Sequence, residues 1–341
     1  MSYQKPKSIN GLMKYLRDHH NININGSNQK LKLSNIGYYH GYKGYRYIGK
    51  ANNTINYNDF KELEAIYTFD SRLKALLYPH VMFIETALKN RVLEVLIEET
   101  KSDSFVDVYN QVLIDYKDYS ILGRSFRTTE EKNKAEKEYS SRLQRRIELR
   151  DKIYSIQTKS YNKGNRIVKH YYDKHLNLPI WAIFELLSLG EFGHLVSCIE
   201  INTRHNISKK LGIRQSDDTD GRILELIIYA VRDLRNSIAH NDVIFDTRFN
   251  TRKISHQLTS NITNTTSVHR VNFSKIVDYI ILIVYILKLL GVNKTELKQL
   301  IVAFSKLSNK LKNQVSPEIY NQIVPYSTYG KLNNLFNYIK S

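Results

Sequence analysis

Residues 220–245, DGRILELIIYAVRDLRNSIAHNDVIF, are the stretch that decides the fold. The apolar side chains in it recur at spacings of three and four residues, the pattern of a helix with one face against a core. These side chains are Leu224, Ile227, Ile228, Val231, Leu234 and Ile238. Just upstream, Asp217, Asp218 and Asp220 supply candidate N-caps. The stretch therefore predicts an amphipathic helix packed on a core.

The end of this helix carries a distinctive group of polar side chains. The sequence R-N-x-x-x-H, from Arg235 and Asn236 to His240, places a cation, an amide and an imidazole within two turns. An imidazole titrates near neutral pH, so it can take a proton from a ribose 2′-hydroxyl or give one to a leaving oxygen. An arginine can hold the charge that grows on a phosphate. These groups suit metal-free cleavage of RNA, because DNA lacks the 2′-hydroxyl.

The spacing of these residues predicts a dimer. Asn236 and His240 share a helix face, whereas Arg235 and His240 lie about 140° apart around an ideal helix. One copy of the helix would therefore make an incomplete site. A two-fold homodimer would bring two Arg/His sets into one cleft. A simpler interpretation also stands, in which the three side chains cap the last carbonyls and complement the helix dipole.

Several segments together resemble a known family. The 235–240 segment looks like the R-x-x-x-x-H signature of HEPN-type RNases, and more narrowly like the Abi-like (abortive infection, AbiD/AbiF-type) family of bacterial phage-defence proteins. Residues 178–190, LPIWAIFELLSLG, resemble the LP-x-W and E-x-L-S-x-G segment of that family. Residues 36–42 resemble its tyrosine/glycine element, and residues 60–89 resemble its paired helices. The resemblance covers most of residues 8–250.

The chain departs from the family pattern at two positions and keeps the motif pair. The family often has a second histidine where this chain has Asn241, and an arginine where it has Lys89. The resemblance implies that His240 acts as general base or acid, that Arg235 stabilises the transition state and that Asn236 orients the histidine or the phosphate. The products would carry 2′,3′-cyclic phosphate and 5′-hydroxyl ends.

The resemblance also leaves other functions open. AbiF-type members are associated with an adjacent structured noncoding RNA. The chain would then be a non-catalytic RNA-binding protein, or a toxin component that a bound small noncoding RNA regulates. In a third version an antitoxin partner silences the motif, directly or by modifying a hydroxyl such as that of Tyr229.

The composition favours a nucleic-acid partner in a reducing compartment. The 51 lysines and arginines exceed the 33 acidic residues, giving a formal net charge of +18. The richness in Asn, Ile and Tyr is typical of AT-rich coding sequence, which raises the lysine content without functional pressure and weakens this argument. The single cysteine, Cys198, excludes an intrachain disulfide and predicts a cytoplasmic location. Neither a metal site nor a cofactor is expected.

Two segments combine cations with features that bind RNA. Residues 30–50 interleave five tyrosines with glycines and lysines, so they would stack on unpaired bases or brace a short β-hairpin or ordered loop near residues 36–48. His40 is taken as incidental. Residues 124–169 hold fourteen Lys/Arg against six Asp/Glu, although mixed charge on a helix usually marks a solvated face. The candidate RNA-binding residues are Tyr39, Tyr42, Lys43, Arg46, Arg142, Arg145, Arg146 and Arg232.

The whole chain predicts an all-α, multi-helix bundle with a HEPN-like core formed by helices in residues 59–99, 179–200 and 221–241. Residues 8–250 would form an Abi-like HEPN-type helical domain, with a variable basic insert at about 101–175. Residues 251–272 are expected to be a linker or long loop, and residues 273–341 a C-terminal helical region.

Three further expectations concern single helices. Pro79 predicts a kink or break in the helical pattern around it. Trp181 is expected in the core. Residues 276–290 form the most apolar run, but the run is shorter than a membrane span and contains Asp278 and Lys288, which predicts a buried helix and no membrane.

Overall fold

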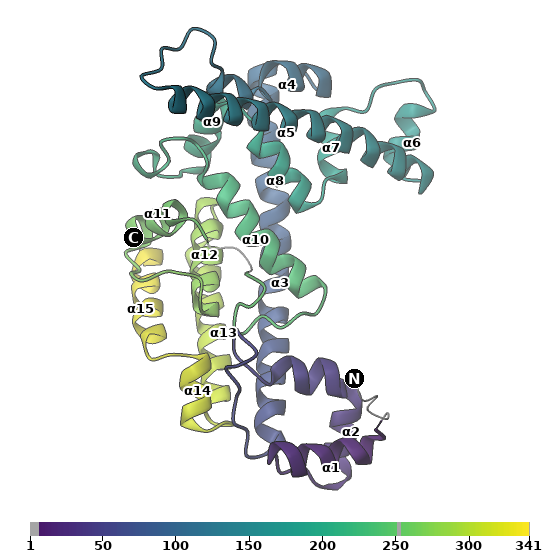
Figure 1. Ribbon diagram of the computed structural model, residues 1–341, viewed down its shortest axis with the longest axis vertical. Coiled ribbons are helices and arrows are strands. Elements are labelled where there is room, and N and C mark those ends of the chain that lie inside the picture. The colour runs from purple at the N-terminus through teal and green to yellow at the C-terminus, as the bar shows by residue number, and fades with distance from the viewer. Residues whose placement is uncertain (1–6, 251–253, 341) are drawn as a thin grey trace. The chain divides into compact units, whose positions relative to one another are not determined.

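The computed structural model describes residues 7–250 and 254–340 (Figure 1). Across these residues it contains fifteen α-helices, a π-helical turn and two 3₁₀ turns, and no β-strand. The prediction of an all-α, multi-helix protein is therefore confirmed.

The helices form two compact units. Unit 1 comprises Met1–Val81, Asp233–Lys253 and Thr266–Ser341, and unit 2 comprises Met82–Arg232 and Ile254–Thr265. The chain passes from one unit to the other inside two helices, α3 (Phe60–Thr100) and α10 (Ile223–Ala239). The polar end of α10 therefore belongs to unit 1, together with the first half of α3.

The N-terminal part of unit 1 is helical where a hairpin was one of the expectations. Helix α1 (Ile9–His20) is capped by the Ser8 hydroxyl, and α2 (Gly26–Ile36) leads directly into the π-helical turn η1 (Gly37–Lys43). The hairpin does not form, and a single antiparallel bridge joins Tyr47 to Thr54 in the ordered loop that follows. Gly41 permits the tight turn, because a Cβ there would lie 2.5 Å from the Ile36 side chain.

The C-terminal part of unit 1 is built around the apolar helix α12 (Ile276–Leu289). Every residue from Ile276 to Leu287 is buried, which confirms the prediction of a buried helix. Helices α13 and α15 lie beside it (Figure 1). The bounds of the remaining helices are α13 (Lys294–Lys312), α14 (Pro317–Ile323) and α15 (Ser327–Lys340). None of the described helices is long and apolar enough to cross a membrane.

Unit 2 is organised along the 34-residue helix α5 (Thr129–Asn162). The 3₁₀ turn η2 (Asp115–Tyr119) and helices α6, α7 and α8 pack on it. The other helical elements of this unit are α4 (Phe105–Gln111), α6 (Arg166–Tyr172), α7 (Ile180–Leu186), α8 (Leu189–Ser197), α9 (Ile201–Leu211), η3 (Gln215–Asp217) and α11 (His256–Thr266).

Helix α11 lies inside residues 251–272, where a linker or long loop was expected. Its side chains Leu258 and Ile262 are fully buried, so two apolar residues one turn apart anchor a segment that is otherwise polar. Residues 251–253 of that stretch lie outside the described residues.

Two local expectations are wrong, a break of the helix at Pro79 and the burial of Trp181, and the physical reasons differ. Helix α3 continues without a break through Pro79, which is exposed. The buried face of α3 runs on past the proline, and that burial outweighs the cost of about 3 kcal/mol for a helical proline. Trp181 is 40% exposed instead of buried, because Ile180, Ile183 and Phe184 already occupy the inward positions of the short helix α7.

A buried carboxylate on α3 holds unit 1 together. Asp70 is fully buried, and its Oδ1 accepts the backbone N–H groups of Ile244 and Phe245, at 2.9 and 2.7 Å. Its Oδ2 accepts the Tyr45 hydroxyl at 2.7 Å and lies 2.9 Å from the Lys74 ammonium. Burial and the Asp70 charge both raise the pKa of Tyr45, which keeps this hydroxyl a donor. One side chain thus joins α3, the loop after η1 and the segment after α10.

We predict that Asp70→Asn lowers the free energy of unfolding by about 3 kcal/mol, because it leaves the Lys74 ammonium buried without its counter-charge. Urea unfolding followed by circular dichroism measures the change. The exposed Asp18→Asn on α1 is the matched control and should alter stability by less than about 0.5 kcal/mol. Equal stability of the two variants would contradict the role of the Asp70 carboxylate.

Candidate functional site

The end of α10 is a left-handed cap. The N–H of Asp242 donates to the Ser237 carbonyl at 2.8 Å and the N–H of Asn241 donates to the Ile238 carbonyl at 3.2 Å. These two bonds are those of the Schellman motif. Asn241 has φ of 58°, a left-handed conformation that asparagine tolerates better than most residues. The departure from the family pattern at this position is therefore compatible with the backbone geometry.

The three motif residues occupy the last turn of α10 and the residue that follows it. Arg235 and Asn236 are half-buried, and Nη1 of Arg235 donates to Oδ1 of Asn236 at 3.3 Å. The His240 backbone N–H donates to the Asn236 carbonyl at 2.9 Å, and its imidazole is exposed. The structure thus places an exposed imidazole after an ordered Arg–Asn pair. The Asn236 amide oxygen contacts the arginine, whereas the resemblance implied that Asn236 orients the histidine or the phosphate.

The side chain of Asn241 links this cap to α3 and to η1. The Lys74 ammonium donates to Oδ1 of Asn241 at 2.9 Å and to its backbone oxygen at 3.3 Å. An ammonium can only donate, so the amide oxygen must face Lys74 and the amide nitrogen must face His40. Nδ2 of Asn241 lies 3.1 Å from Nε2 of His40, which is the acceptor in this contact. The ring proton of His40 therefore sits on Nδ1.

His40 is the residue that the sequence analysis missed. It was taken as incidental, yet it contacts the residue directly after His240, from a position 201 residues away in the sequence. No spacing rule connects two residues so far apart. The only signal was its place inside the tyrosine/glycine element, residues 36–42, on which part of the family resemblance rests.

A pocket of about 310 Å³ opens beside this contact. Its walls are Tyr39, His40, Gly44, Asp242, Val243, Arg248 and Phe249. Arg248 is fixed there by donation to the carbonyls of Gly44 and Tyr47, at 2.8 and 2.7 Å, and by an ion pair with buried Asp246. Its charge is balanced within the protein, so this guanidinium shapes the pocket wall.

The N-terminal RNA-binding candidates divide into exposed and buried side chains. Tyr39 is 75% exposed, and the Lys43 ammonium lies 4.7 Å from the centre of its ring. Tyr42 is buried, and burial raises its pKa to about 12. Arg46 is half-buried near Tyr42. Tyr39 and Lys43 can meet a base and a phosphate, whereas Tyr42 braces the fold, which is the alternative interpretation of these tyrosines.

Two of the arginines expected to bind RNA are engaged in the packing of unit 2. Arg142 donates to Glu138 at 2.6 Å and lies 3.3 Å from buried Asp115. Arg146 donates to the carbonyls of Leu113 and Tyr109, at 2.7 and 2.8 Å, and its guanidinium stacks on the Tyr109 ring. These contacts attach α5 to η2 and α4.

The other two arginines of this set are half-buried in unit 2. The backbone oxygen of Arg145 lies 2.9 Å from Nε2 of His194, and the Arg232 guanidinium lies 4.8 Å from the Tyr229 ring centre. All four arginines belong to unit 2, whereas Tyr39, Tyr42, Lys43 and Arg46 belong to unit 1.

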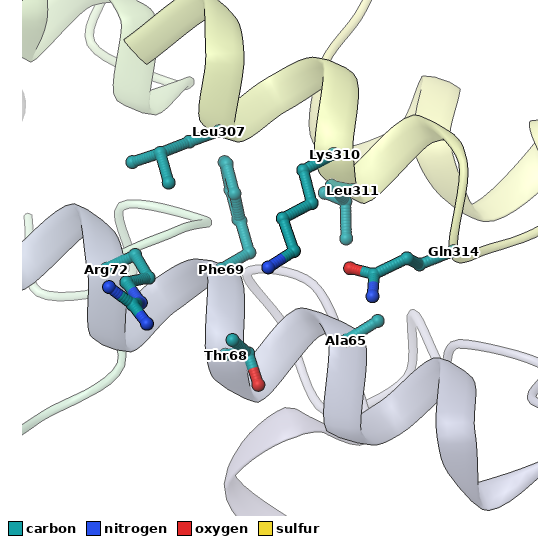
Figure 2. Close-up of a pocket in the computed structure, with 8 residues that line it drawn as sticks. All are labelled: Ala65, Thr68, Phe69, Arg72, Leu307, Lys310, Leu311 and Gln314. Atoms are coloured by element: carbon teal, nitrogen blue, oxygen red, sulfur yellow. The ribbon is translucent and has the colours of Figure 1, made fainter. Parts of the chain in front are cut away.

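A second pocket of unit 1 is lined by apolar, hydroxyl, amide and cationic side chains. It has a volume of about 190 Å³ and lies between α3 and α13. Figure 2 shows Phe69 projecting from α3 and Lys310 projecting toward it from α13, with Arg72 and Gln314 at the sides. Its lining contains neither a histidine nor an acid. In the described part of the chain, no group of three or more His, Cys, Asp or Glu residues is placed to hold a metal ion.

The fold and the site together define an all-α protein that presents an R-N-x-x-x-H motif at a helix C-terminus. The family model described as "Abi-like protein" matches residues 31–246, which include η1, Asp70, Lys74 and the whole motif. The chain therefore belongs to the Abi-like protein family, and this membership indicates a role in abortive-infection defence. No curated protein and no solved structure matches the chain.

The left-handed cap generates a prediction about position 241. Asn241→Gly and Asn241→Ala both remove the amide, but only alanine places a Cβ at positive φ. We therefore expect the glycine variant to be more stable by about 1 kcal/mol in urea unfolding. The same pair of substitutions at Ser71, an exposed helical position of α3, should give the opposite order. If the alanine variant is more stable than the glycine variant at both positions, the left-handed cap at Asn241 is contradicted.

Proposed function

We propose that this protein is a metal-independent endoribonuclease of the HEPN type that acts in bacterial abortive infection. The observation that carries the proposal is the exposed imidazole of His240, four residues after the hydrogen-bonded Arg235–Asn236 pair at the end of α10. In the proposed assembly two α10 helices meet across a two-fold axis, so that both Arg/His sets line one cleft. The dimer is part of the proposal because Arg235 and His240 are five positions apart and therefore lie on different faces of an ideal helix.

The proposed reaction needs only groups that the chain supplies. The His240 imidazole takes the proton of a ribose 2′-hydroxyl, and the 2′-oxygen attacks the adjacent phosphorus. The bond from phosphorus to the 5′-oxygen of the next nucleotide breaks, and that oxygen receives a proton from a second imidazole. The Arg235 guanidinium balances the charge that develops on the phosphoryl oxygens. The products carry a 2′,3′-cyclic phosphate and a 5′-hydroxyl.

His40 supports the same assignment, because it supplies a second imidazole at this end of α10. Cleavage of this type moves two protons, one away from the 2′-oxygen and one to the leaving oxygen. His40 contacts Asn241 and lines the pocket beside it.

A cytoplasmic location fits the free Cys198, which is buried and whose thiol pKa burial raises to about 12.

A second candidate function rests on the Arg235–Asn236 hydrogen bond. A guanidinium that is bonded to its neighbour within its own helix also suits a structural role at the helix end. The protein would then be a non-catalytic RNA-binding protein, or a toxin component, that a bound small noncoding RNA or an antitoxin partner regulates. The net charge of +18 is compatible with an RNA partner in either case.

We predict that the purified protein cleaves RNA in EDTA, leaving cyclic-phosphate ends. Loss of the general base should lower the cleavage rate of His240→Ala by at least about 100-fold. Arg235→Ala should be impaired through lost charge stabilisation. The matched control is His269→Ala, which removes an exposed histidine from unit 1 and should cleave normally. Absence of cleavage, with RNA bound equally by wild type and His240→Ala, would instead support the RNA-binding regulator.

The dimer cleft generates a separate prediction. Arg235→Ala and His240→Ala proteins, each strongly impaired alone, should regain about a quarter of the wild-type rate after they are unfolded together, mixed equally and refolded. Half of the dimers then contain one chain of each variant. In such a dimer one of the two sites combines the intact Arg235 of one chain with the intact His240 of the other, and the second site lacks both. Sedimentation velocity should give a dimer for both variants. Dimers without recovered cleavage would show that each site lies within one chain.

A further inference from the structure

Exposed aromatic rings gather on unit 2 where α5 ends and α6 and α7 follow. Tyr161 at the end of α5, Tyr172 of α6 and Trp181 of α7 are 38%, 38% and 40% exposed. Large aromatic side chains are costly to leave in water, and a group of them on one surface marks a binding site more often than a solvated face.

Together with Tyr171 of α6, these rings form two contacting pairs, and each pair includes one tyrosine of α6. The centres of Tyr161 and Tyr172 are 6.1 Å apart, and those of Tyr171 and Trp181 are also 6.1 Å apart. The Tyr161 hydroxyl donates to Asp173 at 2.8 Å, and the Tyr172 hydroxyl donates to buried Gln157 at 2.6 Å. The rings are therefore held in place before a ligand arrives, which reduces the entropy lost on binding.

The same surface is strongly basic. Residues 159–174 contain five exposed cations and one acid, Asp173. The cations are Lys159, Lys163, Arg166, Lys169 and Lys174. The Lys169 ammonium lies 5.7 Å from the centre of the Tyr161 ring, and the His170 ring lies 5.4 Å from that of Tyr171. The Lys169 ammonium thus places positive charge beside the exposed Tyr161 ring.

We propose that this aromatic and basic surface of α5, α6 and α7 is a binding site for single-stranded RNA. Unpaired bases can stack on Trp181 and the tyrosines, while the lysines pair with the phosphates. Duplex RNA hides its base faces, so the rings would gain nothing from it. The inference rests on RNA being the partner in the proposed function, and it assigns the contact to the end of α5, beyond Arg142 and Arg146, which are engaged in packing.

The single tryptophan of the chain makes the proposal directly testable, because all tryptophan fluorescence comes from Trp181. The experiment titrates His240→Ala protein, which excludes cleavage, with a twelve-nucleotide uridine oligomer and with a duplex of the same length. We expect saturable quenching by the single strand and little change with the duplex. An acidic peptide of glutamates is the third probe, and equal quenching by it would assign the surface to a protein partner and overturn the proposal.

Substitutions then show which side chains contribute to RNA binding. The Kd of each variant is measured from the fluorescence anisotropy of a labelled oligomer. Trp181→Ala and Tyr161→Ala should each raise Kd about tenfold, whereas Trp181→Phe retains a stacking face and should bind nearly as wild type does. Lys169→Ala should lower the slope of log Kd against log salt by about one. Tyr326→Ala is the control, since Tyr326 is 88% exposed but belongs to unit 1.

The outcomes separate this proposal from the nuclease proposal. The binding surface is contradicted if RNA binds without quenching Trp181, or if both alanine variants keep the wild-type Kd. Neither result would bear on cleavage by His240. If RNA quenches Trp181 and the alanine variants bind RNA more weakly, but the wild-type protein never cleaves RNA, the binding surface is supported and the nuclease proposal is contradicted. Circular dichroism of each variant must match that of the wild type, and the folded Trp181→Phe protein checks that any loss comes from the ring.

Discussion

The buried carboxylate of Asp70 is the interaction on which the candidate site depends. Two backbone N–H groups, one hydroxyl and one ammonium converge on it. Only an ionised carboxylate offers enough acceptor positions for these donors in so small a space. Its partner Lys74 then reaches Asn241, and Asn241 reaches His40. The position of the residue next to His240 thus follows from a charge placed on α3, more than 160 residues earlier in the sequence.

The helices were predictable because periodicity fixes which face of a helix is buried. The predicted apolar positions of α10 and residues 276–287 of α12 are buried, as their patterns indicate. The sequence could not reveal the burial of Asp70, because an aspartate in an amphipathic pattern is normally solvated. Nor could it reveal the contact of His40 with Asn241. That contact is set by the packing of η1 against the end of α10, and it leaves no trace in local spacing.

Charge counts were the weakest guide to the site. The excess of cations on α5 indicated an RNA surface, yet Arg142 and Arg146 use their guanidinium groups on Glu138 and on backbone carbonyls. An arginine offers five donors on a long apolar stem, so it serves buried carbonyls as readily as phosphates. The cations at the end of α5 and on α6, by contrast, are exposed. The exposure and contacts of each cation are therefore more informative than the net charge.

Position 241 shows how one residue can satisfy both backbone and side-chain requirements. The left-handed cap restricts the choice to glycine and to the few residues, asparagine and histidine among them, that tolerate positive φ. Glycine would form the cap but would leave Lys74 and His40 without the amide between them. The family that the sequence resembles often has a histidine here, whereas this chain has an amide that contacts the imidazole of His40. The imidazole of His40, supplied by a distant part of the chain, thus lies at the end of α10.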